Sequence, residues 1–149
     1  MGTRSQIIQF SKYWLPVFVW MALIFTASTD VMSGEHTSRF LEPFLRWLAP
    51  NISAATIAMI HVFFRKCAHL AGYAILGALL WRAIRWQLPT SHNNLWRVAA
   101  IALVITASYA SLDEFHQSFV PSRTASVYDV LLDCCGAMLA LAICRFKCS

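Results

Sequence analysis

Four long apolar runs divide this chain, and each approaches the length that a helix needs to cross a lipid bilayer. We expect the membrane spans at about residues 13–28, 63–81, 97–112 and 130–144. The shortest runs would form helices roughly 24 Å long, so they need tilt or flanking residues to cross a hydrocarbon layer about 30 Å thick. Hydrophobic residues make up 58% of the sequence and charged residues 13%, a balance typical of membrane proteins.

The segment between the first two expected spans has a mixed character. It breaks at Pro50, and Ser53 is a good N-cap for a helix that starts again behind it. Its partly amphipathic pattern is typical of a helix that lies on a membrane surface. The sequence therefore predicts an all-α fold: a bundle of four transmembrane helices with an additional interfacial helical segment, forming a single domain over residues 1–149.

The distribution of basic residues indicates how the bundle is oriented. If both termini and the connection between the second and third spans share one side, that side holds seven of the twelve lysines and arginines and none of the seven acids. Lysine and arginine are enriched in cytoplasmic loops, so we expect a multi-pass protein of a cytoplasmic membrane with both termini in the cytoplasm. The basic residues, which give a net charge of +5, form no single groove or stripe, so we expect no nucleic-acid partner.

Residues 111–129, SLDEFHQSFVPSRTASVYD, place polar and charged side chains between two apolar runs. In an alternating bundle, the end of the third span and the start of the fourth lie at the same membrane level as the start of the second. A charge costs roughly 2.5–3.5 kcal/mol at a bilayer centre and less near its surface, so these side chains should face one another. The expected cluster, on the outer side of the membrane, consists of Arg65, Lys66, His69, Asp113, Glu114, His116, Gln117, Arg123, Asp129 and Asp133.

Three separated motifs carry a resemblance to a known family. They read RKCAHLAGY at 65–73, DEFHQSFVPSR at 113–123 and VYDVLLDCCGA at 127–137. In this order between hydrophobic spans, they resemble the VanZ-like family of small bacterial integral membrane proteins, whose founding member is associated with resistance to the lipid-bearing glycopeptide teicoplanin. The resemblance implies a protein of the bacterial cytoplasmic (inner) membrane with a role in the cell envelope or in antibiotic response.

The family's polar signature falls on the expected cluster and on a few neighbours. The matching positions are Arg65, Lys66, His69, Tyr73, Asp113, Glu114, Gln117, Pro121, Arg123, Asp129 and Gly136. The chain departs from the family pattern at two positions, with Gly72 where many relatives carry glutamate and Asp133 where they carry asparagine. These departures leave the net charge of the cluster similar.

The first functional hypothesis is ligand recognition at the outer membrane face. Arg65, Lys66 and Arg123 would contact an anionic group, because the arginine fork suits phosphate or carboxylate and a site withdrawn from water strengthens such bonds. The expected partner is a membrane lipid or a lipid-linked envelope precursor, with a glycopeptide antibiotic as a further candidate. The ligand-binding residues would be Arg65, Lys66, His69, Asp113, Glu114, Gln117, Arg123, Asp129 and Asp133.

The alternative is a membrane-embedded enzyme that acts on a lipid-linked envelope precursor. Asp113, Glu114 and His116, beside His69, are the candidate general acids and bases. The sequence contains no nucleophile motif or phosphate loop, so we expect binding rather than catalysis, and no cofactor. A metal site would use His69, Asp113, His116 and Asp129, whose spacing matches no recognised metal motif, so no metal is expected. A structural role, in which the ion pairs lock the helix ends together, stays open.

Overall fold

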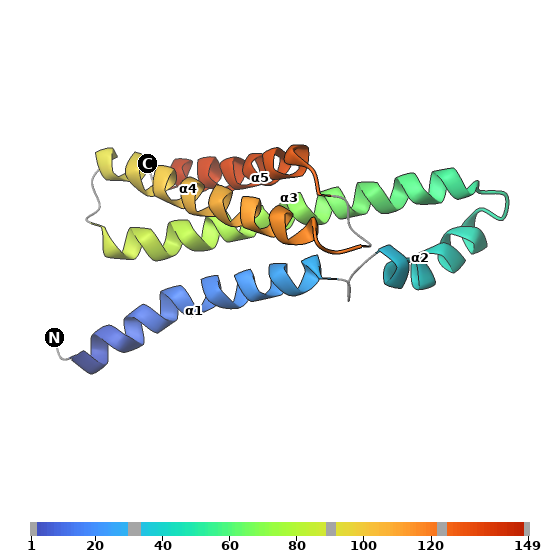
Figure 1. The fold of residues 1–149 in the computed structure, drawn as a ribbon. Coiled ribbons are helices and arrows are strands. Elements are labelled where there is room, and N and C mark those ends of the chain that lie inside the picture. The colour runs from blue at the N-terminus through green and yellow to red at the C-terminus, as the bar shows by residue number, and fades with distance from the viewer. Residues whose placement is uncertain (1–2, 30–33, 89–91, 122–124, 148–149) are drawn as a thin grey trace.

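The structure, a computed structural model, describes residues 3–29, 34–88, 92–121 and 125–147, and all regular structure in these ranges is α-helical. The helices are α1 (Thr3–Ser28), α2 (Gly34–Leu48), α3 (Ala54–Gln87), α4 (His92–Gln117) and α5 (Val127–Phe146) (Figure 1). All of them except α2 are long and apolar enough to cross a membrane. The predicted all-α class, with four spans and one additional helix, is confirmed.

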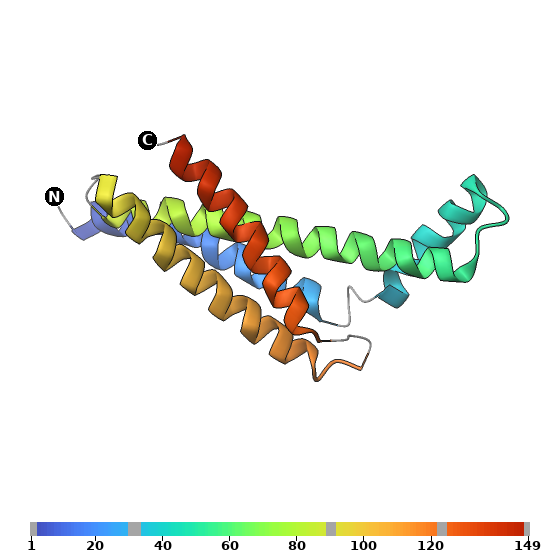
Figure 2. The same cartoon turned by 90° about the horizontal axis from the view of Figure 1, so that it is seen from above.

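Helix α3 is the centre of the bundle, since it contacts each of the other described helices. Figure 1 shows α1 along one side of α3, and α4 and α5 along the other. The largest interface of α3 is with α5, which crosses it at an angle in Figure 2. The two helices run in the same direction, because Lys66 contacts Asp129 and Gly77 lies against Ala137. Helix α5 therefore starts beside the middle of α3.

Helix α3 is longer than the span that the sequence predicts. It contains 34 residues and begins behind the expected N-cap Ser53, whose hydroxyl accepts a hydrogen bond from the Thr56 amide at 3.1 Å. At about 1.5 Å per residue this helix is about 51 Å long, more than the roughly 30 Å of a hydrocarbon layer. Its first part projects beyond the bundle beside α2 (Figure 2). The expected surface segment is therefore divided: α2 is a separate helix, and residues 54–62 belong to α3.

The apolar core lies in the half of the bundle away from α2. Its buried side chains include Leu76, Leu80 and Trp81 of α3, Val98 of α4 and Leu141 of α5. The outward faces of the spans keep large apolar side chains exposed, among them Phe18, Val104 and Leu139. Exposure to water would cost about 25 cal/mol per Å² of such surface, whereas lipid tails impose no comparable cost. The arrangement is that of a multi-pass membrane protein.

Gly136 of α5 lies against the backbone of α3. A Cβ atom at this position would collide with the Leu70 carbonyl oxygen and would lie 3.1 Å from the carbonyl carbon. Backbone atoms within a helix cannot rotate away from such a contact, so the close approach requires a residue without a side chain. Gly72 of α3 differs, because a Cβ atom there would meet no neighbouring atom within 4 Å.

Replacement of Gly136 by alanine is expected to weaken the contact between α3 and α5. The added methyl group forces the helices apart, and such overpacking typically costs about 1–3 kcal/mol of unfolding free energy. Thermal unfolding of the purified protein in detergent measures the effect. Gly72→Ala is the matched control, because its methyl group enters open space. Equal melting temperatures for Gly136→Ala and Gly72→Ala would contradict the assigned contact.

Candidate functional site

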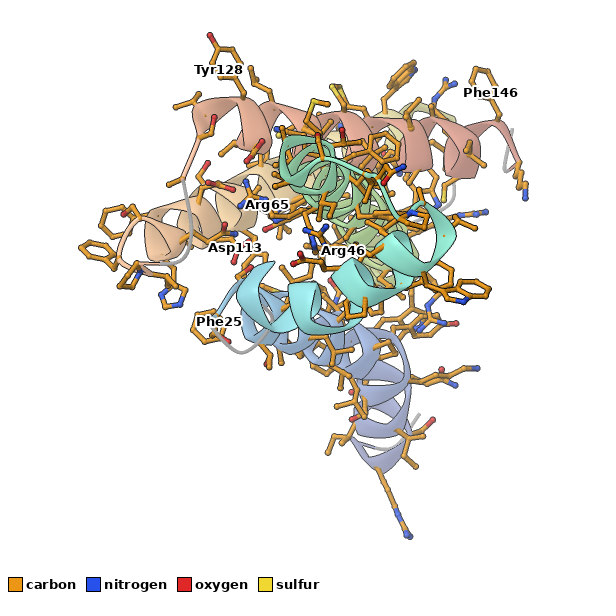
Figure 3. All side chains as sticks on the ribbon, turned by 90° about the vertical axis from the view of Figure 1, so that its right-hand side faces the viewer. Phe25, Arg46, Arg65, Asp113, Tyr128 and Phe146 are labelled. Carbon is orange, nitrogen blue, oxygen red and sulfur yellow. The ribbon has the colours of Figure 1, made fainter. Side chains whose placement is uncertain are left out.

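Polar side chains from three helices meet where α4 ends and α5 begins, beside the middle of α3. Figure 3 views this end of the bundle, with Arg65 and Asp113 lying between the helices and Tyr128 pointing outward. The structure brings together most of the residues for which the sequence predicts convergence. This polar cluster consists of Arg65, Lys66 and His69 of α3, Asp113, Glu114 and Gln117 of α4, and Asp129 and Asp133 of α5.

The rim of the polar cluster is formed by Arg65, Lys66 and Asp129. The Lys66 ammonium group donates a hydrogen bond to Asp129 Oδ1, and Arg65 Nη2 lies 3.6 Å from Asp129 Oδ2. The side chains of Arg65 and Lys66 are 27% and 44% exposed, whereas that of Asp129 is 7% exposed. Asp129 lies in the first turn of α5, where the positive end of the helix dipole also favours a carboxylate. The two cations thus share one carboxylate.

A second contact between α3 and α5 lies one turn deeper. His69 Nδ1 is 3.3 Å from Asp133 Oδ1 and 3.4 Å from Asp133 Oδ2. The His69 side chain is 15% exposed and that of Asp133 is completely buried. Because α3 and α5 run in parallel, His69 follows Arg65 and Asp133 follows Asp129 by about one helical turn in the same direction.

Asp113 joins three helices through one oxygen atom. Its Oδ2 accepts hydrogen bonds from the hydroxyl of Ser28 on α1 at 2.8 Å and from the hydroxyl of Tyr73 on α3 at 3.1 Å. The Gln117 amide, one turn along α4, donates to the same oxygen at 3.2 Å. All four residues are buried, so this network connects the end of α1 to the bundle.

Glu114 holds the start of α5. Its Oε2 accepts a hydrogen bond from the backbone amide of Ser126, the N-cap residue of α5, at 2.9 Å. The Ser126 hydroxyl in turn accepts from the Tyr128 amide at 3.2 Å. A helix start leaves several backbone amides without partners inside the helix, and these two bonds satisfy amides at that position.

Two of the residues predicted for the site are not part of the polar cluster. The imidazole of His116 lies against the ring of Phe25 on α1, with ring centroids 4.7 Å apart. His116 is not in the described group of side chains that could hold one metal ion, so the four-ligand set predicted from the sequence is not assembled among the described residues. Arg123, expected as an anion contact, lies outside the described residues.

Ser28 and Tyr73 contribute to the network around Asp113 but are not among the ligand-binding residues that the sequence predicts. Ser28 ends α1, and its position at the level of the charged motifs is the only signal that could have indicated its contact with Asp113. Tyr73 belongs to the family signature and follows His69 by four residues, which places both on one face of α3. The Tyr73 hydroxyl donates a hydrogen bond to Asp113, as a buried tyrosine hydroxyl usually needs an acceptor.

Charge is distributed unevenly between two levels of the cluster. At the rim, two cations share the carboxylate of Asp129. The other three carboxylates, those of Asp113, Glu114 and Asp133, are all buried and are called the inner carboxylates. Chemically, the rim is suited to an additional anion, whereas the inner carboxylates are suited to a cation or to proton exchange.

Comparison with known proteins agrees with this architecture. The model of the VanZ/LLP1 family matches residues 13–147, which is nearly the whole chain and contains the complete polar cluster. Neither a curated protein nor a solved structure matches the chain. With its four apolar helices, the chain is therefore a multi-pass membrane protein that belongs to the VanZ/LLP1 family.

Proposed function

We propose that this protein lies in the bacterial cytoplasmic membrane with its polar cluster at the outer face. There it binds the anionic head group of a membrane lipid or a lipid-linked envelope precursor. In this role it serves the cell envelope, including the response to lipid-bearing glycopeptides of the teicoplanin type.

The sharing of one carboxylate by two cations is the observation that carries the proposal. The 3.6 Å separation between Arg65 Nη2 and Asp129 Oδ2 is longer than a normal hydrogen bond. A guanidinium group has five donors in a fork that matches two oxygens of a phosphate or carboxylate, so Arg65 keeps capacity for a second partner. Lys66 is the more exposed of the two cations and adds a further charge at the same point. The rim can therefore accept an anion without losing Asp129.

The distribution of charge along the bundle supports the outer location. The end of the bundle opposite the polar cluster carries the last turns of α3 and α5 and the start of α1. Its described basic residues are Arg4, Lys12, Arg82, Arg85, Arg97, Arg145 and Lys147, and no carboxylate of the described residues lies there. An excess of lysine and arginine near the ends of spans favours the cytoplasmic side.

A membrane-embedded enzyme acting on the same class of precursor is the second candidate function. It is favoured by the contact between His69 and Asp133 and by Glu114, whose Oε1 is buried without a hydrogen-bond partner among the described residues. Such groups can transfer protons when a substrate is bound. Incubation of the purified protein with a radiolabelled polyprenyl-diphosphate precursor separates the two functions. A covalent product would establish the enzyme, whereas an unchanged but bound precursor would support recognition.

The proposed orientation predicts the reactivity of two cysteine positions. Cys67 is exposed and unpaired beside Lys66, whereas Lys147 is exposed at the opposite end of the bundle. In a chain whose other cysteines are serine, a membrane-impermeant maleimide should label Cys67 in intact spheroplasts. In a chain without native cysteines, Lys147→Cys should be labelled only after permeabilisation. The reverse pattern would place the polar cluster on the cytoplasmic side.

Arg65→Gln and Lys66→Gln are each expected to weaken the binding of an anionic lipid. A hydrogen bond to a charged group contributes about 1.5–3 kcal/mol, which corresponds to roughly a tenfold to 150-fold rise in Kd. The protein in phosphatidylcholine nanodiscs is titrated with a short-chain polyprenyl phosphate, with phosphatidylglycerol and with teicoplanin. Intrinsic tryptophan fluorescence and melting temperature report binding, and the three titrations distinguish the sources of the anionic group.

Arg46→Gln is the matched control for these two variants. Arg46 lies on α2 near the same end of the molecule (Figure 3), is exposed, and pairs with Glu42 at 2.9 Å. Its loss should leave Kd unchanged. If Arg46→Gln and Arg65→Gln raised Kd equally, binding would be due to general surface charge and not to the polar cluster. Absence of binding to the wild-type protein, together with loss of folded Arg65→Gln protein, would support the structural role of the ion pairs instead.

A further inference from the structure

Among the described residues, the inner carboxylates are buried without a matching number of positive charges. Asp113, Glu114 and Asp133 are 3%, 5% and 0% exposed, and the lysine and arginine of the rim contact Asp129 instead. Removing an ion from water costs several kcal/mol unless a partner compensates it. In the described part of the chain, His69 is the one basic side chain with a recorded contact to these three carboxylates, which favours additional positive charge there, in the form of a cation or of protons.

Each inner carboxylate also has one oxygen atom without a hydrogen-bond partner in the described part of the chain. These shielded atoms are Asp113 Oδ1, Glu114 Oε1 and Asp133 Oδ1, of which Asp133 Oδ1 lies 3.3 Å from His69 Nδ1 in an ion pair. The second oxygens of Asp113 and Glu114 accept bonds from Ser28 and Ser126, so both carboxylates are held in position. A buried acceptor without a partner costs about 1–3 kcal/mol, and the three atoms are therefore suited to a further ligand.

Three side chains of the cluster are close enough to share one metal ion. His69, Glu114 and Asp133 each offer a ligand atom, and these atoms all lie within 4.8 Å of one another. The 3.3 Å between His69 Nδ1 and Asp133 Oδ1 is comparable to the roughly 3.4 Å between ligand atoms around a tetrahedral zinc ion. The other pairs of ligand atoms lie within 4.8 Å, so binding of one ion requires these side chains to move closer together.

We propose that His69, Glu114 and Asp133 bind one divalent transition-metal ion, with Zn²⁺ and Mn²⁺ as the candidates. One imidazole nitrogen and two carboxylate oxygens are a donor set that these ions accept. The ligands come from α3, α4 and α5, so the ion joins all three helices at the end of the bundle. Three protein ligands leave at least one coordination position for water or for an anion. The inference goes beyond the proposed function, because it depends on the inner carboxylates and not on the cations of the rim.

Metal content and metal-dependent unfolding test this site. The full chain, purified in detergent with a tag that contains no histidine, is stripped with EDTA and titrated with Zn²⁺ or Mn²⁺. We expect about one equivalent of metal per chain by elemental mass spectrometry and a higher melting temperature than in EDTA. Glu114→Gln and Asp133→Asn should each raise the Kd for metal roughly tenfold or more. Substitution by Co²⁺ adds a spectrum that distinguishes nitrogen and oxygen ligands from sulfur.

The matched controls are Glu42→Gln and His61→Gln, which change a carboxylate and an imidazole outside the polar cluster and should keep the wild-type Kd. Absence of bound metal and of any change in melting temperature in the wild-type protein would overturn the proposal and assign protons to the inner carboxylates. Equal metal affinity in the wild type and in Glu114→Gln would overturn it as well. If the ligand variants fail to fold, the Co²⁺ spectrum of the wild type decides, because sulfur-to-cobalt bands would assign the metal to the cysteines. None of these outcomes alters the test of anion binding at the rim.

Discussion

The close contact between Gly136 and the Leu70 carbonyl group is the constraint on which the rest of the structure depends. It allows α5 to lie parallel to α3 with their backbones in contact, and it fixes how far one helix is shifted along the other. In this register Asp129 meets Lys66, and Asp133 meets His69 one turn deeper. A larger residue at position 136 would displace both contacts together. The positions of the charged groups in the polar cluster therefore depend on the packing of α3 against α5.

The polar cluster combines two environments with different chemistry. Its rim is partly exposed and has more cations than carboxylates, whereas its interior is buried and has more carboxylates than cations. Hydrogen bonds from Ser28 and Ser126 hold the carboxylates of Asp113 and Glu114 in fixed positions. Such preorganisation is what a binding site requires, because ligand binding then orders few additional groups. A role in joining helix ends is therefore compatible with a role in recognition.

Particular residues show where the sequence could predict the structure and where it could not. The spans and the common level of the charged motifs follow from the apolar runs and from their alternating direction. Ser53 indicated a helix start, but the charges of Arg65 and Lys66 suggested a separate span behind it, whereas α3 continues through both residues without a break. His116 could not be excluded from the site, since helical spacing places it near Asp113. In the structure His116 of α4 contacts Phe25 of α1, whereas Glu114 faces the start of α5.

The sequence by itself determined that this chain is a four-span membrane bundle with its carboxylates gathered at one end, because long apolar runs require a nonpolar solvent and charges avoid it. Only the tertiary structure decided which carboxylate meets which base. That choice depends on the rotation of each helix about its axis. Successive residues are turned by about 100°, so the side chains of residues i and i+2 point to nearly opposite sides of a helix. The rotation of α5 is set by Gly136 against α3, a contact between segments distant in the sequence. Local patterns carry no information about it, and so the grouping of His69, Glu114 and Asp133 emerged only from the packed helices.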